Sequence, residues 1–174
     1  MLMRELLRLF GQIALLRRGP QDVPASPLLL IVTVLGFIAI SFLVKSLLPA
    51  TEGPWLLELM VEVLFMLGWY AVLLRFVNRP ERFLQTATAL FGYQIVLVPP
   101  IAAAIWLVQQ FQKDATWLLP SLAIALMLVV WLVAAGARIL KAALEWSMPA
   151  SVAMTILQTV AGELLVLAIF SPAT

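Results

Sequence analysis

Four ionisable side chains lie inside or at the edge of long apolar stretches of this sequence. Glu58 and Glu62 are four residues apart, so a helix places both carboxylates on one face. Glu163 lies in a second apolar stretch, and Lys45 lies near the end of a third. Because a charge at the centre of a bilayer costs ~2.5–3.5 kcal/mol or more, such residues are functional candidates by default.

The residue types that are missing restrict the chemistry these side chains could do. The chain has no His and no Cys, so it lacks the commonest general base, the thiolate nucleophile and the commonest metal ligands. The two aspartates, Asp22 and Asp114, fall in expected loops, which excludes a paired-aspartate intramembrane site. The sequence therefore predicts no catalytic residue, cofactor or metal. The carboxylates can still bind a cation, a proton or a polar headgroup.

The composition indicates that lipid surrounds the elements that position these residues. Hydrophobic residues make up 64% of the chain and charged residues 11%, against ~45–50% and ~25% in soluble domains. Helices satisfy their backbone hydrogen bonds internally, as a bilayer requires. We therefore predict an all-α fold, a polytopic transmembrane bundle forming one domain over 28–174.

Five apolar segments separated by proline, glycine or charged turns are long enough to cross a bilayer. The first has 21 residues, which rise ~31 Å as a helix. The predicted spans are 28–48, 55–74, 83–111, 117–137 and 149–170. The segment 138–148 is expected to be a loop that is helical at first.

Residues 1–18 form a different kind of segment. Leucines and an isoleucine recur at helical spacing opposite charged and polar residues, which predicts an amphipathic helix lying flat at the membrane interface. The alternative is an ordinary helix packed on the rest of the protein. Residues 19–27 (GPQDVPASP) contain three prolines and a glycine and are expected to be a linker.

The distribution of Lys and Arg predicts the orientation. With the N-terminus in the cytoplasm, nine of the 11 basic residues fall inside, and only Lys45 and Lys113 fall outside. We therefore expect a multi-pass inner-membrane protein whose C-terminus, 171–174, is periplasmic or external. The basic residues are spread through short loops, so no nucleic acid is expected as a partner.

This orientation puts the four ionisable residues in the outer half of the bilayer. Glu62 and Glu163 are each seven residues from an outer helix end, or about 10 Å deep, and Lys45 is about 5 Å deep. If the first, second and fifth spans are neighbours, these side chains and Glu58 line a polar cavity that opens outward. The alternative is structural: the carboxyl groups are held by Lys45 or by glutamines, or are protonated.

Two further groups of residues are candidates. Gln94 is a candidate for interhelical hydrogen bonding, and the consecutive Pro99 and Pro100 predict a kink or break in the third span. Such a break lines a site in some transporters, although prolines in spans are also common without function. Three arginines in one basic loop are expected to touch anionic lipid or a cytoplasmic partner: Arg75, Arg79 and Arg82.

The segment from Gly92 and Tyr93 to Pro99 resembles the Yip-domain family, in which a Gly-Tyr pair opens a span that soon meets a proline. The resemblance implies five spans and a cytoplasmic N-terminal segment. The tyrosine- and proline-containing motif of eukaryotic members is absent, so the chain resembles bacterial-type members. For these, the resemblance implies a topology rather than the binding of small GTPases.

Three functions stay open. The first is a non-enzymatic scaffold or accessory subunit that binds another membrane protein or a second copy of itself, in addition to lipid. The second is a small transporter or channel component that uses Glu62 and Glu163. The third is a membrane enzyme acting on lipid, for which only carboxylates, Lys or Ser are available.

Overall fold

The chain folds into helices throughout the part that the computed structural model describes, residues 2–47 and 54–170. No strand occurs within these residues, so the predicted all-α fold is confirmed. The six α-helices and two short 3-10 helices are α1 (Leu2–Ala14), η1 (Pro20–Asp22), α2 (Pro27–Leu47), α3 (Trp55–Phe76), η2 (Pro80–Arg82), α4 (Phe83–Gln110), α5 (Ala115–Leu144) and α6 (Met148–Phe170).

Helices α2 to α6 are each long and apolar enough to cross a bilayer, which makes the chain compatible with a multi-pass membrane protein. Of the predicted turn at 49–54, only Pro54 lies within the described residues. The C-terminal tail at 171–174 lies outside them. Helix α5 continues seven residues beyond the predicted span end at Ala137, to Leu144. Its last two turns are the segment that we expected to be helical before the loop.

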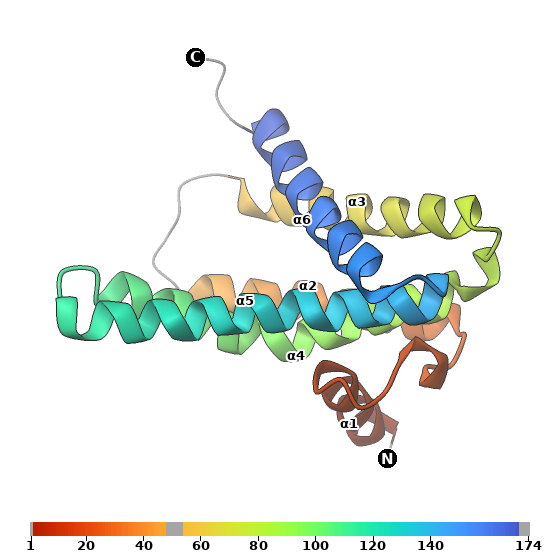
Figure 1. Cartoon of the computed structure of the whole chain (residues 1–174), viewed down its shortest axis with the longest axis horizontal. Helices are drawn as coiled ribbons and strands as arrows, with labels where there is room; N and C mark the ends of the chain where they lie inside the picture. Colours follow the sequence, from red (N-terminus) through yellow and green to blue (C-terminus); the bar gives the residue numbers. More distant parts are fainter. Residues whose placement is uncertain (1, 48–53, 171–174) are drawn as a thin grey trace.

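Helix α4 is the centre of the bundle. It packs against α2, α5 and α1, whereas α6 packs against α5 and α3. Figure 1 shows α2, α4 and α5 side by side along the long axis of the molecule, with α6 crossing at an angle. Eight consecutive residues of α4, 86–93, are buried, so this part of the helix touches protein on all sides.

We predicted a kink or a break at Pro99 and Pro100, and the break is excluded, because α4 is one continuous helix from Phe83 to Gln110. A kink at the two prolines stays a prediction. Neither proline has an N–H, so the carbonyls of Ile95 and Val96 lose their usual partners. Helical structure persists because neighbouring helices support it on both sides of the prolines, and because an unwound segment would expose still more unpaired backbone groups.

Helix α1 ends at Ala14, four residues before the predicted end at Arg18. Leu16 has a φ of 61°, which turns the chain into the left-handed region. Leu16 N–H donates to the Ile13 carbonyl at 2.9 Å, and Arg17 N–H donates to the Gln12 carbonyl at 2.8 Å. These two bonds form a Schellman motif, which satisfies carbonyls at the helix end.

One face of α1 packs on the bundle. Phe10 and Ile13 are buried, and the Phe10 ring lies so close to Gly92 of α4 that a Cβ atom there would be 2.3 Å from it. The indole Nε1 of Trp131 in α5 donates to the Ala14 carbonyl at 2.7 Å. Helix α1 therefore packs on the rest of the protein, as in the alternative we considered. Its position at a membrane interface stays a prediction.

Four helix ends and the linker after α1 gather at one end of the bundle, which we call the basic end. Here α3 and α5 end, α4 and α6 begin, and the linker after α1 packs against α4 and α5. Left-handed residues other than glycine follow three helices at this end, namely Leu16, Asn78 and Glu145. Such turns cost of order 1–3 kcal/mol each, so surrounding contacts must hold them.

We predict that Gly92→Ala destabilises the protein by about 1–3 kcal/mol, because the new methyl group meets the Phe10 ring. Thermal unfolding in detergent measures this change. Gly68→Ala is the matched control, since its added Cβ meets nothing within 4 Å, and it should be neutral or stabilise by up to ~1 kcal/mol. Adding Phe10→Ala to Gly92→Ala should remove most of the specific penalty. Equal effects of the two glycine substitutions would contradict this packing.

Candidate functional site

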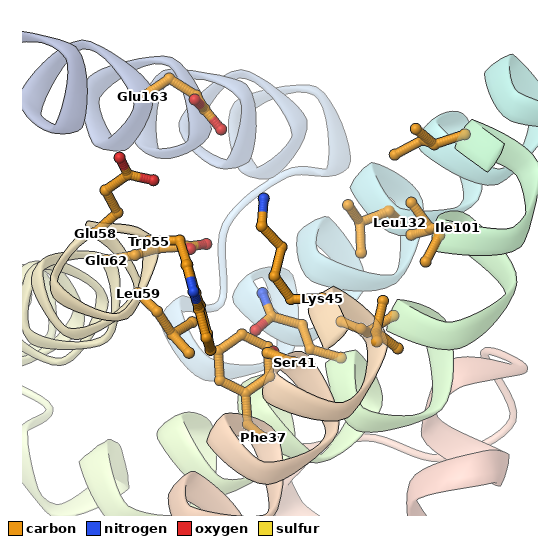
Figure 2. A pocket seen from close by; sticks show the side chains of 15 residues that line it. Phe37, Ser41, Lys45, Trp55, Glu58, Leu59, Glu62, Ile101, Leu132 and Glu163 are labelled. Carbon is orange, nitrogen blue, oxygen red and sulfur yellow. The ribbon is translucent and has the colours of Figure 1, made fainter. Parts of the chain in front are cut away.

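The four ionisable residues singled out from the sequence line one cavity. Lys45 of α2, Glu58 and Glu62 of α3, and Glu163 of α6 surround a volume of about 550 Å³, which we call the glutamate cavity. Figure 2 shows the two α3 carboxylates and Glu163 directed toward the cavity from one side, with Lys45 extending into it from α2. The neighbourhood that the sequence analysis required of the first, second and fifth spans is therefore present.

Helix geometry explains how these residues meet. Glu58 and Glu62 occupy successive turns of α3, so their side chains share the face that looks toward α2 and α6. Lys45 lies in the last turn of α2. Its four-carbon stem carries the ammonium group away from its own helix. The rest of the wall is largely apolar and includes Phe37, Trp55, Ile101 and Leu132.

The charges in the cavity are not paired with one another. All ion pairs within 4.0 Å among the described residues involve Glu145, at the basic end. Three glutamates and one lysine line the cavity, so with every group ionised its charge is −3 + 1 = −2. Among the described residues, no three acidic side chains converge as ligands of one metal ion would. The arrangement is an acidic chamber with room for a ligand that carries positive charge.

Gln94 lies where the glutamate cavity meets a second chamber. That chamber has a volume of about 360 Å³ and is also lined by Glu58, Glu62, Gln94 and Glu163. The Gln94 Nε2 atom is 3.9 Å from the Met66 sulfur, a weak contact, while its Oε1 atom is buried without a hydrogen-bond partner. Gln94 therefore makes a weak hydrogen bond from α4 to α3, in line with its candidate interhelical role, while its Oε1 atom offers an acceptor to a ligand or a water molecule.

A hydrogen bond between α3 and α6 supports the glutamate wall. The Tyr70 hydroxyl donates to Gln158 Oε1 at 3.1 Å, and Tyr70 is buried. Gly162 lets α6 approach α3 closely, since an added Cβ would be 3.3 Å from the Phe65 ring. We did not single out Tyr70 from the sequence. A tyrosine within a span could have indicated this bond, because a buried phenol needs a partner.

The two prolines of α4 do not belong to the cavity wall. Their neighbours Val98 and Ile101 line it, whereas Pro99 and Pro100 do not. The transporter-like broken helix that we considered therefore has no counterpart at this cavity.

Two of the three arginines in the predicted lipid-contacting loop bind Glu145 instead of remaining free. Arg79 donates to Glu145 through Nη1 at 2.7 Å and Nη2 at 2.6 Å. Arg82 Nη2 donates to the same carboxylate at 2.8 Å, and Arg82 Nη1 donates to the Ala143 carbonyl at 3.0 Å. This Glu145 clamp ties the α3–α4 loop to the end of α5. Arg75 is exposed, and contact of the three arginines with lipid or a cytoplasmic partner stays a prediction.

Comparison with known proteins gave no match to any family model, curated protein or solved structure. The resemblance to the Yip-domain family therefore stays a prediction. In this structure its Gly-Tyr pair has a packing role, since Gly92 admits Phe10 and Tyr93 is buried in the core.

The Glu145 clamp makes a prediction about stability and pH. Hydrogen bonds from Arg82 and Arg79 lower the pKa of Glu145 below its usual value. The clamp therefore adds stability above the unfolded-state pKa of about 4.3, and this stability is lost as the pH falls through the folded-state value. The melting temperature of the wild type should exceed that of Glu145→Gln at pH 7, and the difference should shrink as the pH falls below about 4.

Glu81→Gln is the control for this prediction, because Glu81 is exposed and outside the clamp. It should leave the melting temperature unchanged across the same pH range. A difference between wild type and Glu145→Gln that stays constant with pH would show that the clamp does not depend on the ionised carboxylate.

Proposed function

We propose that this protein is a membrane-embedded binding or transport component for organic cations, with the glutamate cavity as its binding site. The observation that carries the proposal is the presence of Lys45, Glu58, Glu62 and Glu163 around one cavity, with no ion pair between them. Ionisable groups in a span are expensive unless water or a partner accompanies them. A cationic ligand is a partner of the right charge.

The composition of the cavity wall favours an organic cation with apolar substituents. Three carboxylates provide charge, while Phe37, Leu59, Ile101 and Leu132 provide apolar surface. The indole of Trp55 lines the same cavity and can add a cation–π contact. The volume of about 550 Å³ is within the ~300–1,000 Å³ typical of small-molecule sites. Lys45 is the internal competitor, since its ammonium group carries the same charge as the ligand.

Binding of tetraphenylphosphonium, a lipophilic cation, tests the proposal on the purified chain in detergent. We expect Glu62→Gln and Glu163→Gln each to weaken binding by about tenfold, because each removes a carboxylate from a site of low dielectric. Lys45→Met should strengthen binding, since it removes a like charge. Isothermal titration calorimetry measures all three affinities.

Glu81→Gln is again the matched control, because it removes a carboxylate outside the cavity. It should bind the cation as the wild type does. The proposal fails if the cavity variants and the control bind equally well, or if Lys45→Met weakens binding. Competition by a neutral analogue with the same aromatic groups would indicate an apolar site without charge recognition, which also contradicts the proposal.

A second candidate is a scaffold or accessory subunit that packs against another membrane protein. It is favoured by an apolar groove of about 490 Å³ along α3 and α6, lined by residues that include Phe65, Gly68, Val72 and Leu157. The space beside Gly68 is open, and small residues let a neighbouring helix approach closely. Failure of the cation titration, together with a partner chain bound along this groove, would favour this candidate over the first.

A further inference from the structure

A second charged cavity lies at the basic end of the bundle, far from the glutamate cavity along the helices. It has a volume of about 510 Å³, and Arg17, Arg18, Arg138 and Lys141 line it. We call it the basic pocket. It does not depend on the proposed cation site, because the two cavities have no residue in common.

The two acidic residues of the basic pocket are engaged elsewhere. Asp22 Oδ2 accepts a hydrogen bond from Gly19 N–H at 3.0 Å, and Glu145 binds Arg79 and Arg82. Within 4.0 Å, no described carboxylate pairs with any of the four cations that line the pocket. The pocket therefore presents an excess of positive charge to whatever occupies it.

The fold brings these cations together from distant parts of the chain. Arg138 and Lys141 are three residues apart on α5, so they lie on one face of the helix. Arg17 and Arg18 follow the left-handed turn at Leu16, which directs the chain back toward α5. Gln85 Nε2 of α4 donates to the Val23 carbonyl at 3.0 Å, and Val23 is buried. The stretch that carries Arg17 and Arg18 is therefore tied to the bundle on both sides, at Ala14 through Trp131 and at Val23 through Gln85.

An adjoining chamber supplies a buried hydroxyl group. It has a volume of about 390 Å³ and shares Gln21, Ala142 and Glu145 with the basic pocket. Thr86 lines this chamber, is only 1% exposed, and its Oγ1 has no hydrogen-bond partner. A buried hydroxyl without a partner is costly, and an anion that extends from the basic pocket into this chamber would supply an acceptor for it.

We propose that the basic pocket binds the phosphate of an anionic phospholipid headgroup. Guanidinium groups suit phosphate because they donate paired hydrogen bonds to its oxygens. Basic pockets between helices at the cytoplasmic side of membrane proteins bind such headgroups. The surroundings fit a lipid rather than a soluble anion. Leu7 of α1 and Leu15, the residue that follows α1, each expose about half of their surface, which leaves apolar side chains available to the acyl chains.

Lipid titration of the full-length protein in detergent tests this site. Dihexanoyl phosphatidylglycerol is added, and the shift in melting temperature gives its affinity. Replacing Arg138 and Lys141 together by Gln should weaken binding by roughly 30-fold, since each cation near anionic lipid contributes about a factor of five. Arg17→Gln combined with Arg18→Gln should give a similar loss, so the result does not depend on the folding of a single variant.

Arg4→Gln combined with Arg8→Gln is the matched control, because it also removes two exposed positive charges but leaves the pocket intact. It should change the affinity less than twofold. Equal losses in the control and in both pocket variants would show that only net charge matters and would overturn the site. Two further results would overturn it: dihexanoyl phosphatidylcholine binding as tightly as phosphatidylglycerol, or inorganic phosphate alone displacing the lipid at equal concentration, which would assign the pocket to a free anion.

Discussion

The apolar outer surface of the helices is the constraint on which the rest of the structure depends. Large side chains such as Leu28, Phe76, Leu119 and Leu126 expose well over half of their surface, and they lie on helices long enough to span a bilayer. Lipid stabilises such a surface, whereas water does not. Polar groups must therefore gather inside the bundle or at its ends, and the described residues form charged cavities in both places.

The two cavities differ in how the protein accommodates their charge. In the glutamate cavity, Glu62 comes from α3 and Glu163 from α6, and two other α-helices lie between these along the chain. Helices α3 and α6 are held together by the Tyr70–Gln158 hydrogen bond and by the close approach at Gly162. At the basic end, Glu145 is bound by two arginines. The remaining basic side chains are thereby left available to an anion.

Much of the fold could be predicted because hydropathy and breaker residues report directly on the medium around a helix. The same argument located the glutamates, since counting residues from a span end gives their depth, and residues of equal depth can meet. Of the kink or break predicted at Pro99 and Pro100, the break does not occur, because the propensity of proline does not include the support of neighbouring helices. The end of α1 was misplaced because Leu16 turns the chain into the left-handed region, where two backbone hydrogen bonds close the helix.

The basic pocket could not be found from the sequence, because its residues come from the linker after α1 and from the far end of α5. Nor does the sequence show that Arg79 and Arg82 form ion pairs with Glu145, whereas the other described basic residues at this end do not. Both features depend on the left-handed turns at helix ends, where a few backbone angles decide which side chains meet. Hydropathy carries no information on those angles.

The most direct test of this account is the labelling of single cysteines in intact cells with a membrane-impermeant maleimide. The chain has no natural cysteine, so each introduced thiol reports on one position. Glu58→Cys, in the glutamate cavity, should react from outside the cell, whereas Arg18→Cys, in the basic pocket, should react only after the membrane is made permeable. Labelling of both positions from the same side of an intact membrane would contradict a bundle that spans the bilayer between its two charged cavities.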